Sequence, residues 1–199
     1  MTSESDLKPG MIGVTPTYGN WYDRFVGRAI RFATATQDQY GKWHDAKVNH
    51  SFIYVGDGQI VEATPKGAKL SNWDSYGSDA IWPVNGIGTR DKTGRLTPLE
   101  IDDATLAKVA DEARKLVGTP YGFLDLLAVG LAQARFKRVV DPSEVLAEQP
   151  WWVRQIEDEH RLICSQLDDT AYKNVGVELL QNIPVPGLVT PADLYGLFL

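Results

Sequence analysis

The sequence predicts an α+β fold in which an antiparallel sheet packs against helices. One supporting pattern is a β-hairpin signal over 48–63, where β-branched and aromatic runs flank Gly56-Asp57-Gly58. A second is an apolar stripe with helical spacing over 101–117. Strand and helix patterns alternate along the chain, which favours layers of helices on a sheet. With 199 residues, 43% of them hydrophobic, the chain can bury one core, so we expect a single domain over 1–199.

The N-terminal part predicts a strand followed by a helix. The stretch LKPGMIGVT contains a Pro-Gly turn and then a short apolar run. In the next segment Trp21, Phe25, Ala29 and Phe32 fall on one helical face.

The loop of the hairpin decides which side chains share a face. If Gly56-Asp57-Gly58 is a three-residue loop, Phe52 faces Glu62, and His50 and Glu62 become diagonal neighbours on one face, about 7 Å apart. A two-residue Asp-Gly turn would shift the pairing by one residue and put them on opposite faces. Gly58 favours the longer loop, because such loops end in a left-handed residue.

The remaining elements are mostly helical. The 101–117 helix has Asp102 or Asp103 as its cap and Gly118 at its end. The segment 122–160 is interpreted as an insertion of loops and short helix containing Trp151-Trp152, and its apolar run FLDLLAVGLA is too short to span a membrane. The segment CSQLDDTAYKNVG predicts a helix closed by glycine, and the C-terminal segment is punctuated by proline.

Composition excludes some partners and compartments. The net charge is −6, with 20 basic and 26 acidic residues and no basic cluster, so we expect no nucleic-acid partner. A single cysteine forms no intramolecular disulfide, and the polar start MTSESDLKP lacks the features of a signal peptide. The default expectation is a cytoplasmic protein without an integral membrane segment.

Cys164 has two interpretations from the residues alone. Free cysteine is often a small apolar residue of the core. At the start of a helix, however, the thiol lies near unpaired backbone N–H groups and the positive end of the helix dipole, which favours a nucleophilic thiolate.

A nucleophilic cysteine needs a base, and the chain has three histidines. His50 opens a strand, and Glu62 on the return strand could fix its tautomer. The structural alternative for His50 is a hydrogen-bonded residue at the end of a strand, and the alternative for Glu62 is a solvated strand residue. His160 lies among charged residues and His44 in a loop, so neither is expected to be functional. No CxxC or HExxH spacing occurs, and we expect no metal.

Four segments in order carry a resemblance: NHSFIYVGDGQIVEATPKG, GTPYGF, ICSQLDDTAY and VTPADL. Together they resemble the circularly permuted NlpC-type papain-like cysteine hydrolases, a group that includes the lecithin:retinol acyltransferase-like enzymes. The resemblance implies a permuted papain-like fold with Cys164 as nucleophile, His50 as general base and acid, and Glu62 as the orienting group. Tyr121 could line the site or serve as a core aromatic. The segment 122–160 does not align with the family.

This resemblance implies an amidase or peptidase that needs no cofactor and acts on peptide or peptidoglycan-type substrates. Two alternatives stay open: a lipid acyltransferase or thioesterase, and a structural or binding component of a larger assembly such as a phage particle. Trp151-Trp152 could form an apolar rim for a lipid or partner protein, or could pack inward. A wall-cleaving role without a signal peptide would fit a virion-associated protein, because phages carry domains of this family.

Overall fold

The computed structural model describes residues 3–16, 36–37, 43–44, 48–121, 163–183 and 189–199. These residues form mixed helices and antiparallel sheets, which confirms the α+β prediction. The expected helix with Trp21 and Phe32, the insertion at 122–160 with Trp151-Trp152, and His160 lie outside the described residues.

The main sheet has four antiparallel strands in the order β1-β4-β5-β6. Their bounds are β1 (Ile12–Thr15), β4 (His50–Gly56), β5 (Gln59–Thr64) and β6 (Gly67–Asn72). Strands β4 and β5 are the predicted hairpin, and β1 is the predicted N-terminal strand, so these predictions are confirmed. Because β4 lies between two partners, its backbone is hydrogen-bonded on both edges, which makes it a rigid support.

The tip of the hairpin combines the two loop geometries that the sequence left open. Gly56 pairs with Gln59 around a two-residue turn at Asp57 and Gly58, both of which have positive φ (53° and 68°). A bulge at Val55 then shifts the register by one residue, so that Phe52 pairs with Glu62 as predicted. The predicted register is therefore confirmed, but a two-residue turn with a bulge produces it instead of a three-residue loop.

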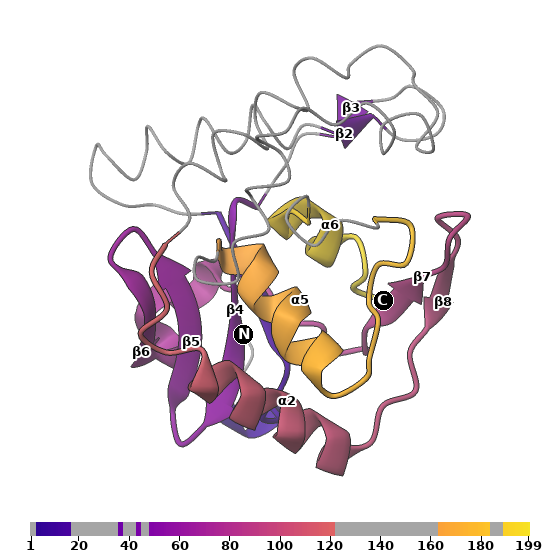
Figure 1. Ribbon diagram of the computed structural model, residues 1–199. Coiled ribbons are helices and arrows are strands. Elements are labelled where there is room, and N and C mark those ends of the chain that lie inside the picture. The colour runs from indigo at the N-terminus through magenta and orange to yellow at the C-terminus, as the bar shows by residue number, and fades with distance from the viewer. Residues whose placement is uncertain (1–2, 17–35, 38–42, 45–47, 122–162, 184–188) are drawn as a thin grey trace.

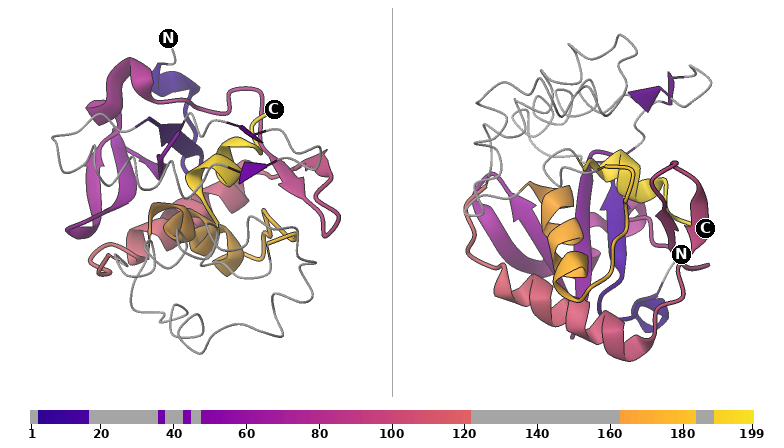
Figure 2. Two further views of the ribbon diagram at one scale, coloured as in Figure 1. Left: turned by 90° about the horizontal axis from the view of Figure 1, so that it is seen from above. Right: turned by 45° about the vertical axis from the view of Figure 1, so that its right-hand side comes forward.

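Helices cover one face of the sheet. Helix α5 (Cys164–Asn174) lies over the strands, and α2 (Asp103–Lys115) runs across its lower end (Figures 1 and 2). Asp102 caps α2 through a hydrogen bond from the N–H of Thr105, and α5 is followed by Gly176 at φ 83°. Both helix predictions are confirmed to within two or three residues. The short α6 (Pro191–Tyr195) follows Thr190, which caps it.

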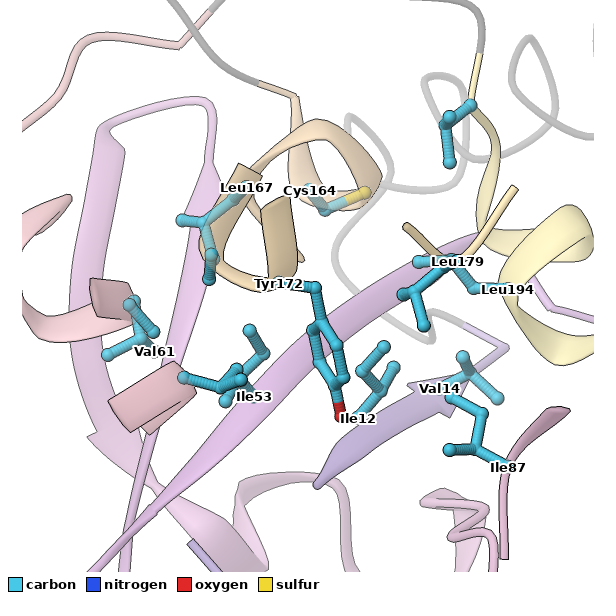
Figure 3. Packing of buried hydrophobic residues seen from close by; sticks show 14 of the residues in the cluster. Ile12, Val14, Ile53, Val61, Ile87, Cys164, Leu167, Tyr172, Leu179 and Leu194 are labelled. Atoms are coloured by element: carbon cyan, nitrogen blue, oxygen red, sulfur yellow. The ribbon is translucent and has the colours of Figure 1, made fainter. Parts of the chain in front are cut away.

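The main core lies between the sheet and the helices. Figure 3 shows Tyr172 pointing from α5 into this core beside Ile12, with Ile53 on its other side. The Tyr172 hydroxyl donates to the carbonyl of Gly10 at 2.8 Å. Gly10 has φ 94°, and a side chain there would meet the Leu106 backbone, so glycine allows α2 to approach closely.

A second, smaller cluster covers the opposite face of the sheet. It is built from Phe52, Tyr54, Ile60 and Trp82, with residues of the 3-10 helix η2 (Trp73–Asp79) packed on it. A short 3-10 turn, η1 (Glu4–Asp6), reaches the same cluster through the hydrogen bond from Tyr54 to Glu4. Residues 50, 52 and 62 therefore face this cluster, whereas residues 51 and 53 face the helices.

Two further ladders have two strands each. One pairs β7 (Gly88–Arg90) with β8 (Leu96–Pro98), and the other pairs β2 (Thr36–Gln37) with β3 (Trp43–His44). The prediction that His44 lies in a loop is therefore wrong, because His44 pairs with Thr36 in a short antiparallel ladder. The residues around His44 do not by themselves indicate this pairing. Among the described residues, no helix combines the length and apolar character needed to cross a membrane.

Candidate active site

The hairpin brings His50 and Glu62 together. His50 is the first residue of β4, and Glu62 lies on β5 opposite Phe52, so the two side chains share a face as diagonal neighbours. Nε2 of His50 donates to Oε2 of Glu62 at 2.7 Å. Both residues are buried, with 7% and 2% of their surface exposed. A hydrogen-bonded pair so well shielded from water is not a solvated strand feature.

Three further side chains hold the carboxylate of Glu62. The hydroxyl of Tyr76 donates to Oε2 and the hydroxyl of Ser71 donates to Oε1, both at 2.5 Å. The ammonium of Lys69 lies 3.3 Å from Oε1. Glu62 is therefore fixed in one orientation, and both of its oxygens are occupied.

This set of partners determines the charge of Glu62. Burial by itself favours the protonated acid, but the hydrogen bond and charge of His50, followed by the hydrogen bonds from Ser71 and Tyr76, lower its pKa far below the usual range. Glu62 is thus a carboxylate in the folded protein, able to accept a hydrogen bond from an imidazolium.

Cys164 is the first residue of α5. The residue before it, Ile163, occupies the cap position and has an apolar side chain that cannot accept a hydrogen bond from the first turn, as Ser or Asp would. The N–H of Ile163 donates instead to Oε1 of Gln166 at 2.9 Å, and Ser165 donates to the carbonyl of Val189 at 2.6 Å. These contacts fix the helix start, which lies at the edge of the main core (Figure 3).

The site joins Cys164 to the buried pair through His50. The imidazole lies close enough to the side chain of Cys164 for the two groups to interact, and it hydrogen-bonds Glu62 through Nε2. Since Nε2 is engaged by Glu62, Nδ1 is the ring nitrogen that remains for the thiol. Cys164 is 3% exposed, so its chemistry is sheltered from bulk water.

The two neighbours of His50 also stabilise its charged form. Burial lowers the pKa of the imidazole, but the hydrogen bonds to Cys164 and Glu62 and the charges of both groups outweigh burial and raise the pKa of His50 to about 10. An imidazolium between a thiol sulfur and a carboxylate is the arrangement that can pass a proton to a leaving group.

Two further expectations from the sequence concern Tyr121 and a metal site. Tyr121 is partly buried and packs against the same core that contains Cys164, which fits the core interpretation as well as a place near the site. No group of three His, Cys, Asp or Glu side chains suited to a metal occurs in the described part of the chain.

Sequence reasoning missed five residues of this region. Lys69, Ser71 and Tyr76 belong to β6 and η2, elements that the sequence patterns did not predict. Alternation of side chains along a third strand after the hairpin could have placed Lys69 and Ser71 on one face, and in the structure Lys69 pairs with Glu62 on that face. Ser51 and Asp168, described below, were also missed.

Comparisons with known proteins add no assignment. A scan against protein-family models matched none, and a search of the curated proteins returned no match.

Proposed function

We propose that the protein is a cysteine hydrolase with a Cys164-His50-Glu62 triad and a permuted papain-like fold of the NlpC type. The observation that carries the proposal is the position of His50, which neighbours the helix-start Cys164 and hydrogen-bonds a buried carboxylate at 2.7 Å. The order of the elements, with the histidine strand before the cysteine helix, supports the permuted arrangement.

The acylation step uses all three residues. The Cys164 thiolate attacks the carbonyl carbon of an amide, and a C–S bond forms as the carbonyl oxygen becomes an oxyanion. As the oxyanion collapses, the C–N bond breaks and the His50 imidazolium gives its proton to the departing amine. Glu62 stays ionised and keeps the ring oriented throughout.

Deacylation reverses the role of His50. The neutral imidazole removes a proton from water, the resulting hydroxide adds to the thioester carbonyl, and the C–S bond breaks to release an acid and the thiolate. The backbone N–H of Cys164 at the start of α5 is placed to donate to the oxyanion in both steps. Such a donor contributes about 3 kcal/mol to the transition state in hydrolases of this kind.

The substrate class expected from this chemistry is a peptide or peptidoglycan-type amide. The same steps with an ester or a lipid acyl group would give a thioesterase or acyltransferase. A folded domain with an unreactive Cys164 would be a binding or structural component of a larger assembly. The experiments below separate these outcomes.

The first experiment measures the rate of iodoacetamide alkylation against pH. Because Cys164 is the only cysteine, the modified site is unambiguous. We expect measurable alkylation well below neutral pH in the native protein and a shift of the profile to higher pH in His50→Ala. His44→Ala is the matched control, and it should leave the profile unchanged. An unchanged profile in His50→Ala would contradict the proposal.

The second experiment identifies the acyl donor. The native protein is mixed with peptide amides, peptidoglycan fragments and lipid esters, and intact mass spectrometry records an acyl adduct on Cys164. We expect an adduct from amides and none in Cys164→Ser with the same donors under matched conditions. Adducts from lipid esters alone would indicate an acyltransferase or thioesterase and not an amidase. If no donor gave an adduct although alkylation was fast, the amidase, acyltransferase and thioesterase activities would all be excluded.

A further inference from the structure

A second buried carboxyl group lies behind the proposed site. Asp168 is one helical turn after Cys164 on α5, and its exposed fraction is 0%. Neither of its carboxyl oxygens makes a hydrogen bond of ordinary geometry with the described residues. A carboxylate in that position would be very costly, because an ionised group without hydrogen bonds loses its hydration on burial.

The group that faces Asp168 across the interface between α5 and the sheet is Ser51. Ser51 follows His50 on β4, is also 0% exposed, and its hydroxyl likewise lacks a hydrogen bond of ordinary geometry. The hydroxyl is near enough to influence the carboxyl group without forming a regular bond. In proteins, buried hydroxyl and carboxyl groups usually have hydrogen-bond partners. Among the described residues Ser51 and Asp168 lack them, and Ser51 is the residue next to the proposed general base.

The charged groups around Asp168 are few. From β4 the nearby titratable residue is His50, and from α5 they are Asp169 and the Tyr172 hydroxyl. The buried side chains that α2 and α6 contribute are apolar: Leu106, Val109, Ala110, Ala113, Pro191 and Leu194. Burial, with a smaller contribution from the charge of Asp169, raises the pKa of Asp168 to about 8, although Ser51 and the charge of His50 act in the opposite direction.

We propose that Asp168 is a positioning residue of the Cys164–His50 pair: its carboxyl group is a neutral acid at neutral pH, and its ionisation in alkaline solution adds a second negative charge beside the His50 imidazolium. The proposal rests on the proposed function for its chemical meaning. In neutral solution Glu62 alone balances the imidazolium, and in alkaline solution Asp168 helps to retain the proton on His50. Retention of that proton slows the deacylation step, which needs the neutral imidazole.

The experiment has two spectroscopic measurements on the whole protein. Infrared difference spectra between the native protein and Asp168→Asn report the carbonyl stretch of a protonated carboxylic acid. Ring ¹⁵N shifts of His50 follow its titration by NMR. We expect the acid band at pH 7 with loss in alkaline solution, and a His50 midpoint lower by on the order of one pH unit in Asp168→Asn.

Matched variants make each outcome decisive. Asp169→Asn removes a neighbouring buried carboxyl group that has Lys173 as its partner at 3.5 Å, and it should leave the acid band in place. Ser51→Ala removes the facing hydroxyl and should raise the pH at which the acid band disappears. This variant tests the proposal even if Asp168→Asn does not fold.

Two results would overturn the inference. One is an ionised Asp168 at pH 7, seen as absence of the acid band. The other is an unchanged His50 midpoint in Asp168→Asn. Failure of the proposed function is distinguishable, because it is an alkylation profile of Cys164 that does not respond to His50→Ala, a measurement that does not involve Asp168.

Discussion

Glu62 and Asp168 are both buried carboxyl groups that interact with His50, yet they lie on opposite sides of the sheet and their pKa values are shifted in opposite directions. Glu62 has His50, Tyr76 and Ser71 as hydrogen-bond donors, and its pKa is far below the usual range. Asp168 has no hydrogen bond of ordinary geometry among the described residues, and its pKa is raised to about 8. Both side chains are buried, so the hydrogen-bond donors, together with the charge of His50, account for the opposite directions of the two pKa shifts.

The largest expected effect comes from removing the better-paired carboxylate. Glu62→Gln keeps the shape but leaves His50 and Lys69 without their anion, so we expect a loss of about 3 kcal/mol in the free energy of unfolding. The pKa of Glu62 is lowered on folding from its usual 4.5, so its contribution to stability is fully present above that value and is lost progressively as the pH falls from there toward the folded-state pKa. Urea unfolding at pH 7 and pH 3 measures this. Glu100→Gln, on the exposed surface, is the control, and equal losses in the two variants would contradict the comparison.

A smaller loss is expected when Glu62 keeps its charge but loses one donor. Tyr76→Phe removes a hydroxyl that donates at 2.5 Å to a buried oxygen, and we expect a loss of about 2 kcal/mol. Phe preserves the stacking of this ring on Phe52, where the centroids are 5.0 Å apart. Tyr54→Phe provides the matched control, since it removes a hydroxyl that donates to the exposed Glu4 and should cost less than Tyr76→Phe. The opposite order would mean that the donors do not stabilise Glu62.

Asp168→Asn should raise the free energy of unfolding at alkaline pH, whereas the two preceding substitutions lower it. Because the folded-state pKa is raised from 3.8 to about 8, the native protein retains a proton that the unfolded chain releases, and stability falls as the pH rises between these values. The variant lacks this loss, so its advantage over the native protein should grow by more than about 1 kcal/mol between pH 4 and pH 8. Parallel urea unfolding series across that range measure the difference. A constant difference would indicate that Asp168 is ionised in the folded protein.

The smallest effect is expected at the exposed edge of the Glu62 network. The side chain of Lys69 is 52% exposed and its ammonium is 3.3 Å from Oε1, so Lys69→Ala should cost under about 1 kcal/mol. Added salt should reduce that cost further. Unfolding in low and high salt tests this, and a loss as large as that of Tyr76→Phe would show that the ion pair acts as if buried.

Local patterns predicted the hairpin and both long helices because each depends on residues close in sequence. The diagonal placement of His50 and Glu62 followed from alternation along two strands joined by a short tip. The bulge at Val55 was not predictable, since no local residue preference separates it from a three-residue loop. The elements β6 and η2 were missed because their mixed polar composition lacks a clear period.

Asp168 could have been found from the helix itself. Cys164, Asp168 and Tyr172 are spaced four residues apart and therefore share one face, and the structure buries all three. The contact of Asp168 with Ser51 joins segments more than a hundred residues apart, and only the folded chain reveals it.

The bulge at Val55 makes the spacing of the hairpin tip part of the chemistry. Hairpin tips usually tolerate insertions and deletions, because they are exposed and few contacts depend on them. Here the bulge absorbs one residue of the tip and keeps Glu62 opposite Phe52. If the full-length tip closed as a two-residue turn without the bulge, β5 would slide by one position and Glu62 would turn toward the helices, while every residue of the proposed triad remained in the sequence. In a protein-engineering library, length-preserving substitutions that abolish the bulge would therefore separate His50 from Glu62, whereas a one-residue deletion that removes the bulge would keep Phe52 opposite Glu62.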